Sequence, residues 1–215
     1  LKALRAHPAF SAEVDRGALA LLLRHNYIPA PHSIYRGIHK LPPGTLLRLS
    51  TGRRDATPEV WWSLAEVAER GMAQPFAGSD DDAVTALEQV LGNAVRGQMM
   101  ADVPLGALLS GGVDSTLITA LAQAGSRQRV RTFTIGFDEK QYDEATHARA
   151  VAAHLGTDHT EMRLAGTDAL ALVPQLPAMY DEPFADSSQL PTHLVMQLAR
   201  QHVTVALSGD AGDEF

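Results

Sequence analysis

Leu108-Leu109-Ser110-Gly111-Gly112-Val113-Asp114-Ser115-Thr116 is the stretch on which the predicted fold depends. The apolar residues from Val103 to Leu109 predict a strand, and a helical pattern runs from about Asp114 to Ala124. The Ser-Gly-Gly between them is then a tight turn that leads into a helix. Unpaired backbone N–H groups and the positive end of the helix dipole, about half a charge, make such a turn an anion site, most often for phosphate.

The carboxylate of Asp114 lies where a bound phosphate would repel it. A divalent cation between the two groups removes this conflict, because Mg²⁺ is commonly held by one or two carboxylates together with phosphate oxygens. The hydroxyl groups of Ser110, Ser115 and Thr116 add hydrogen-bond donors. The first hypothesis is therefore a site for a nucleotide polyphosphate with Mg²⁺.

The composition limits the classes of protein to which the chain can belong. Its 215 residues are 45% hydrophobic and 20% charged, as in globular proteins. A net charge of −7 argues against a nucleic-acid partner, and no apolar run reaches the length that spans a bilayer, so we expect no membrane partner either. There is no cysteine, which excludes a thiol nucleophile and allows the cytoplasmic location that we expect. The chain lacks an initial Met and stops after an acidic motif, so we also expect an internal fragment of a larger protein.

Strands and helices alternate from residue 79 onward, which predicts an α/β fold with a doubly wound parallel sheet. The expected strands are 103–109, 130–136, 159–164 and 203–207, and the expected helices are 79–99, 114–124, 143–155, 166–174 and 190–202. Before them we expect a helix over 11–26 capped by Asp15, two short strands at 33–38 and 45–49, and an irregular stretch over 51–78.

Ligands of doubly wound sheets bind outside the carboxyl ends of the strands. Three segments follow such ends, at 110–115, 136–139 and 208–214, and two of them are small turns that contain glycine and carboxylates. Asp114 and Asp213 can therefore hold the same Mg²⁺. The turn at 110–115 is not the P-loop of kinases, because no Gly-Lys-Ser/Thr is present, and the dinucleotide pattern Gly-x-Gly-x-x-Gly is also absent.

Two further groups of polar residues have simpler explanations than a metal site. Ser79-Asp80-Asp81-Asp82 fits an N-cap with acidic residues that the helix dipole favours. His147 and His154 are two helical turns apart, too far to share one ion, so these residues and His159 are expected to be solvated or capping side chains.

Ser110-Gly111-Gly112-Val113-Asp114-Ser115 resembles the pyrophosphate-binding loop of the N-type ATP pyrophosphatases. Other motifs narrow the resemblance to the asparagine synthetase (glutamine-hydrolysing) family. They are Thr132–Phe137 followed by Tyr142-Asp143-Glu144, then Asp181–Ser188 and Leu207–Glu214, and, near the start, Tyr35–Ile38 with Leu41–Gly44.

This resemblance implies a set of roles and a division of the chain. Residues 1–52 would be the β-rich C-terminal part of an N-terminal-nucleophile glutamine amidotransferase domain, 53–78 a linker, and 79–215 the N-terminal part of an adenine nucleotide alpha hydrolase-like synthetase domain. Asp114 and Asp213 would bind Mg²⁺, and Asp210 would be the catalytic carboxylate near the acceptor and the incoming ammonia, where other members carry Glu. ATP and its pyrophosphate would be bound by Leu108, Ser110, Gly111, Gly112, Asp114, Ser115, Ile135, Ser208 and Gly209.

The reaction that the resemblance implies is the amidation of aspartate to asparagine through a β-aspartyl-AMP intermediate, with release of AMP and pyrophosphate and with glutamine-derived ammonia. Because this chain has no cysteine, it lacks the glutaminase nucleophile. Two alternatives stay open. The first is a related amide-forming enzyme with another carboxylate acceptor, similar to β-lactam synthetase or to enzymes that amidate sugars or peptides. The second is a nucleotide-binding module without catalysis. Ala211, which replaces the usual glycine, supports the second alternative. A homodimer is also open.

Overall fold

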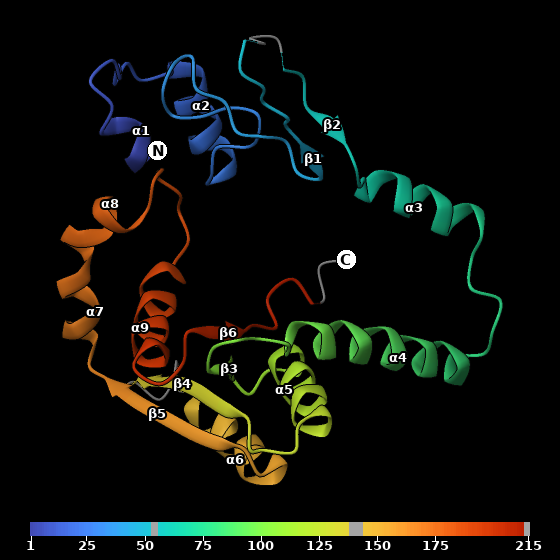
Figure 1. The fold of residues 1–215 in the computed structure, drawn as a ribbon. Coiled ribbons are helices and arrows are strands. Elements are labelled where there is room, and N and C mark those ends of the chain that lie inside the picture. The colour runs from blue at the N-terminus through green and yellow to red at the C-terminus, as the bar shows by residue number, and fades with distance from the viewer. Residues whose placement is uncertain (53–55, 138–143, 213–215) are drawn as a thin grey trace. The chain divides into compact units, whose positions relative to one another are not determined.

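The computed structural model describes residues 1–52, 56–137 and 144–212. The chain forms two compact units (Figure 1). Unit 1 contains residues 1–77 together with 174–187, and unit 2 contains 78–173 together with 188–215. The chain therefore leaves unit 2 after Val173 and returns to it at Ser188. No helix among the described residues has both the length and the apolar character needed to cross a membrane.

Unit 2 is built on a four-stranded parallel sheet in the order β5-β4-β3-β6. Its strands are β3 (Leu105–Leu108), β4 (Arg131–Phe137), β5 (Asp158–Leu164) and β6 (Val205–Leu207). The chain crosses from β5 to the opposite edge to form β6, so the carboxyl ends of β3 and β6 are neighbours. The α/β fold with a parallel sheet is confirmed, and each of the four strands predicted after residue 79 is found within two residues of its expected limits.

Helices cover both faces of this sheet, as Figure 1 shows. One face packs on α4 (Asp80–Gln98), α5 (Val113–Gly125) and α6 (Ala145–Leu155), with Ala107 of β3 fully buried beneath Val95 and Ala122. The other face packs on α9 (Gln189–Arg200), where Phe133 of β4 contacts Leu198. Strand residues alternate between the two faces, which is why both Ala107 and its neighbour Leu108 meet apolar partners.

Local sequence sets the ends of several helices. Ser79 and Asp82 form a reciprocal capping box at the start of α4: the Ser79 Oγ accepts from the Asp82 N–H, and the Asp82 carboxylate accepts from the Ser79 N–H at 2.9 Å. The expectation of an N-cap here is confirmed. The Ser79 hydroxyl also donates to the Asp82 carboxylate at 2.7 Å, and this bond, together with the one from the Ser79 N–H, lowers the pKa of Asp82. Gly156 ends α6 in the left-handed conformation that glycine favours.

Unit 1 begins with α1 (Lys2–Arg5) and α2 (Arg16–His25), and its apolar centre contains Ala18, Ile28 and Ile34. Asp15 caps α2 as predicted, by accepting from the N–H groups of Gly17 and Ala18, and these bonds lower its pKa. The unit continues with β1 (Thr45–Leu46), β2 (Glu59–Val60) and α3 (Leu64–Ala73). Its later part, 174–187, contains α8 (Leu176–Met179), which follows α7 (Gly166–Leu172) and a 3₁₀ turn at Val173–Gln175.

Four secondary-structure expectations for the first 78 residues were wrong. The helix expected over 11–26 begins only at Arg16, after its cap Asp15. The strand expected at 33–38 is only an isolated bridge between Val14 and Tyr35, and the strand at 45–49 is shortened to β1. The stretch 51–78 is not irregular throughout, because it contains β2, which pairs antiparallel with β1, and the ten-residue helix α3. Ser63 caps α3 by accepting from the Glu66 N–H, a signal that the irregular composition around it concealed.

Candidate functional site

The turn between β3 and α5 is held by its own serine side chains. The Ser110 and Ser115 hydroxyl oxygens lie 2.9 Å apart, the Ser110 N–H donates to Ser115 Oγ, and the Gly112 N–H donates to Ser110 Oγ at 3.2 Å. Gly112 is the N-cap of α5. The first turn of α5 leaves the N–H groups of Val113 and Asp114 without an acceptor among the described residues, as an anion site requires.

Gly111 brings this turn close to α6. Its φ of +88° lies in the left-handed region, and a Cβ atom there would lie 2.7 Å from the Ala148 backbone N and 2.8 Å from His147 Cβ. Because both the backbone conformation and the backbone neighbour exclude a side chain, only glycine fits. This contact with α6 was not predicted from the sequence. The signal that could have predicted it is the pairing of two parallel strands, β3 and β4, each of which is followed by a helix.

The turn after β6 lies directly against the first turn of α5. A Cβ atom on Gly209 would be 2.6 Å from the Ser115 backbone N, and a Cβ atom on Gly212 would be 2.8 Å from Asp114 Oδ1. The structure therefore brings Gly209 and Ser208 together with the 110–115 turn. This arrangement follows from the sheet order, in which β6 is paired with β3.

The Asp114 carboxylate has no cationic or hydrogen-bonding partner among the described residues, although it lies beside the turn after β6. An unpaired carboxylate next to unsatisfied backbone N–H groups fits a site shared by a phosphate and Mg²⁺. Asp213, the predicted second ligand, lies outside the described residues, and no cluster of three metal-binding side chains occurs within them. The magnesium pair therefore stays a prediction.

Leu108 and Ile135 lie at the same edge of the sheet. Leu108 is the last residue of β3 and is paired in register with Phe133, so Ile135 lies two residues farther along β4. The Leu108 side chain packs in the cluster that contains Phe133 and Leu198. The contact of Leu108 and Ile135 with adenine stays a prediction. The Asp138 and Glu139 expected beyond Ile135, and the motif residues Tyr142 and Asp143, lie outside the described residues.

Ala211 adopts a φ of +64° in the turn after β6. The turn closes around it, since the Gly212 N–H donates to the Gly209 carbonyl at 3.1 Å and the Asp210 N–H donates to Ser208 Oγ at 3.1 Å. Ala211 replaces the usual glycine of the family, and it occupies the left-handed region that disfavours a Cβ atom. Asp210 is exposed at this edge.

The expectation that His159 is a solvated or capping side chain was wrong, because its imidazole is partly buried and hydrogen-bonded within unit 2. Its Nδ1 lies 2.9 Å from the Thr132 hydroxyl, which is also 2.9 Å from the Thr157 hydroxyl, and burial lowers the pKa of the imidazole. His147 and His154 are exposed on α6.

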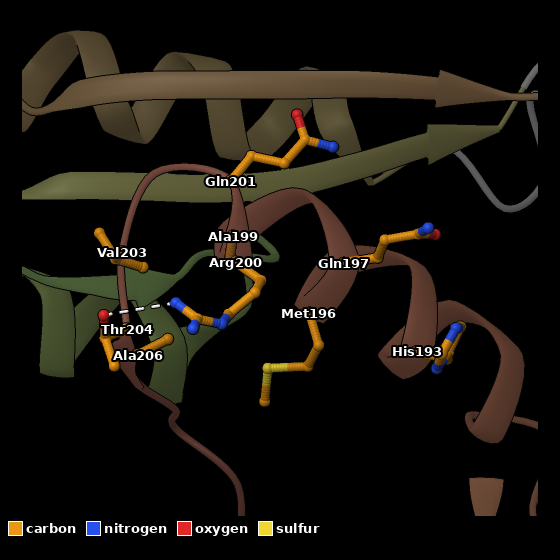
Figure 2. Close-up of a pocket in the computed structure, with 9 residues that line it drawn as sticks. All are labelled: His193, Met196, Gln197, Ala199, Arg200, Gln201, Val203, Thr204 and Ala206. Carbon is orange, nitrogen blue, oxygen red and sulfur yellow. Dashed lines mark hydrogen bonds between the residues drawn. The ribbon is translucent and has the colours of Figure 1, made fainter.

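A hollow of about 620 Å³ lies elsewhere on unit 2, between α9 and the β6 edge (Figure 2). It is open to solvent, and Arg200 spans part of it to reach the Thr204 hydroxyl at 3.4 Å. None of the predicted site residues lines this hollow.

Comparison with known proteins identifies two family regions in this chain. Residues 86–215 match the family model of asparagine synthase, and residues 1–62 match that of the glutamine amidotransferase domain. The chain belongs to the asparagine synthase family. We refer below to residues 86–215 as the synthase stretch and to residues 1–62 as the amidotransferase stretch.

Curated relatives agree with this membership of the asparagine synthase family. Asparagine synthetase [glutamine-hydrolyzing] 1 of Bacillus subtilis is 28% identical over 94% of this chain and 31% of its own length. A Methanocaldococcus jannaschii protein, provisionally named as a second such synthetase, is 33% identical over 94% of this chain and 38% of its own length. The chain thus spans about a third of the length of these relatives. Among solved structures, NMN synthetase from Francisella tularensis gives a TM-score of 0.43 at 17% identity, covering 57% of this chain and 52% of that one.

Proposed function

We propose that this chain contributes the ATP site of a glutamine-dependent enzyme that converts aspartate to asparagine. The observation that carries the proposal is the contact of the Gly209–Gly212 turn with the first turn of α5, in a chain of the asparagine synthase family. The proposal is supported by the two glycine turns and by the Asp114 carboxylate, which has no partner among the described residues, because ligands of such folds bind at this edge of the sheet.

In this proposal, the N–H groups of the 110–115 turn and the hydroxyls of Ser110 and Ser115 bind the pyrophosphate end of ATP. Leu108 and Ile135 offer backbone contacts to the adenine, and Ser208 and Gly209 contact the nucleotide from the neighbouring strand. Asp114 and Asp213 would hold Mg²⁺, which supplies positive charge to the leaving pyrophosphate. The sequence lacks the lysine of a P-loop, which favours release of pyrophosphate over transfer of the terminal phosphoryl group.

The proposed chemistry has two steps. The aspartate side-chain carboxylate attacks the α-phosphate of ATP, so that a carbon–oxygen–phosphorus linkage forms as the bond to pyrophosphate breaks, giving β-aspartyl-AMP. Ammonia from glutamine then attacks the acyl carbon, AMP leaves, and the amide loses its extra proton, for which exposed Asp210 is the nearby acceptor. Positioning and fixed electrostatics supply most of the catalysis in reactions of this kind.

Product analysis of the full-length protein tests this proposal. With ATP, Mg²⁺, aspartate and ammonium ion, we expect equal amounts of AMP, pyrophosphate and asparagine. Formation of ADP and phosphate would contradict it. A panel of other carboxylic acids decides the acceptor: products with another acid alone would favour the related amide-forming enzymes, and no products with any acid would favour a binding module, for which the strained Ala211 is the supporting observation.

A further inference from the structure

Glu182 lies in a part of the synthase stretch that folds with the amidotransferase stretch. It belongs to the excursion 174–187, which is part of unit 1 although its flanking residues belong to unit 2. Asp181–Ser188 is one of the motifs that carry the family resemblance. The contacts of Glu182 within unit 1 supply one.

Three donors from residues 33–40 converge on the Glu182 carboxylate. Its Oε1 accepts from the Ser33 hydroxyl at 2.8 Å and from the Ile34 N–H at 2.7 Å. Its Oε2 forms an ion pair with Lys40 Nζ at 2.5 Å. The Glu182 side chain is 13% exposed and Ser33 is 3% exposed, so the bond between these two side chains is largely shielded from water.

The partners of Glu182 are themselves held in place. Lys40 Nζ also donates to the Ile28 carbonyl, and Ile28 and Ile34 are part of the apolar centre of unit 1. A second bond, from the Ala185 N–H to the Asn26 carbonyl at 2.7 Å, fixes the excursion three residues later. A carboxylate with both oxygens bound in a mostly buried position has one preferred orientation, because a hydrogen bond lost there leaves a buried polar group without a partner.

We propose that Glu182 is a positioning residue that ties the synthase stretch to the amidotransferase stretch, and that use of glutamine-derived ammonia depends on this tie. The inference rests on the proposed function. Ammonia released by glutamine hydrolysis must reach the acyl-adenylate before it escapes into solvent, which requires the two stretches to stay in a fixed relation. Ammonia added from solution does not require this relation, so the two nitrogen sources separate positioning from chemistry.

The test compares Glu182→Gln and Lys40→Met with the unaltered full-length protein, using aspartate and either glutamine or ammonium ion. We expect pyrophosphate formation with ammonium ion to stay within about twofold, while formation with glutamine falls about tenfold or more. We also expect more than one glutamate to be released per pyrophosphate, because ammonia is lost. Glu13→Gln is the matched control, since it removes an exposed ion pair with Arg36 from the same unit.

An equal loss of pyrophosphate formation with both nitrogen sources would overturn the proposal, because it would show general destabilisation of the protein. Unchanged pyrophosphate formation with both sources would also overturn it. Hydrogen exchange gives an independent readout of the tie: Glu182→Gln should raise exchange at both 28–40 and 174–187, and unchanged exchange there would also overturn it. If the unaltered protein forms no pyrophosphate with either nitrogen source, the proposed function and the dependence on glutamine-derived ammonia both fail. The hydrogen-exchange result alone then decides whether Glu182 ties the synthase stretch to the amidotransferase stretch.

Discussion

Gly111 is the residue at which backbone geometry most directly limits what the site tolerates. Its positive φ and the position of the Ala148 backbone leave no space for a Cβ atom. In Gly111→Ala we therefore expect the 110–115 turn to shift by several tenths of an ångström and ATP–pyrophosphate exchange to fall about 100-fold. The measurement is exchange by the full-length variant, with folding checked by circular dichroism.

The matched control for this substitution is Gly97→Ala in α4. A Cβ atom at Gly97 would meet no atom within 4 Å, and its backbone is helical, so alanine should raise stability by about 0.5–1 kcal/mol and leave exchange unchanged. Normal ATP affinity in Gly111→Ala would contradict the role of the turn.

Asp114 tests the metal assignment. Asp114→Asn keeps the size of the side chain and removes its charge, so we expect adenylation to fall by about 100-fold or more while glutaminase activity of the full-length protein is unchanged. ATP affinity measured with and without Mg²⁺ provides a second readout, because the variant should lose the gain in affinity that Mg²⁺ gives. A variant that still binds ATP more tightly with Mg²⁺ would disprove the assignment of Asp114 as a ligand.

Ala211 should be suboptimal for stability. Its left-handed conformation costs roughly 1–2 kcal/mol for a residue with a Cβ, so Ala211→Gly should raise the free energy of unfolding by up to about 1 kcal/mol after the added chain entropy is subtracted. Thermal unfolding measures this change. The control is Ala94→Gly on the exposed side of α4, where the same substitution should lower stability by about 1 kcal/mol. A loss of stability in both variants would show that the 208–212 turn has another conformation.

Among the structural elements, the excursion 174–187 has a predicted dependence on pH. Burial raises the pKa of Glu182, but its bonds to Lys40, Ile34 and Ser33 outweigh this and hold the pKa below its usual value. A carboxyl group whose pKa is lowered on folding stabilises the protein above the unfolded-state pKa, about 4.3, and loses this contribution as the pH falls through the lower folded-state pKa.

The corresponding measurement is the thermal unfolding midpoint of the unaltered protein and of Glu182→Gln as a function of pH. We expect a constant difference between the two at neutral pH, equivalent to about 1–3 kcal/mol, which shrinks as the pH falls below about 4.3. A difference that is the same at every pH would mean that the charge of Glu182 does not stabilise unit 1.

The elements of unit 2 could be predicted well because their sequence signals are local and agree with one another. Apolar strand residues, the capping box at Ser79 and the glycine after α6 each limit an element independently. The first 78 residues were harder to predict because β1 and β2 have only two residues each and their pairing depends on a partner that is distant in sequence.

At the level of the whole chain, the turns of the candidate site could be predicted because parallel strands bring their carboxyl ends to one edge. The sequence could not predict that 174–187 would fold with unit 1, since the donors for Glu182 come from residues about 150 positions earlier, separated by 149 residues from Ser33 and 148 from Ile34. Local patterns contain no information about a bond of that range.

The central claim is that the turns at 110–115 and 208–212 form the pyrophosphate site of an acyl-adenylating enzyme. ATP–pyrophosphate exchange by the full-length protein, without any nitrogen source, tests it most directly, with Gly209→Ala as the variant that forces the two turns apart. We predict exchange that requires aspartate and Mg²⁺ and falls about 100-fold in Gly209→Ala. Exchange that needs no carboxylic acid, or that is unchanged in Gly209→Ala, would contradict the claim.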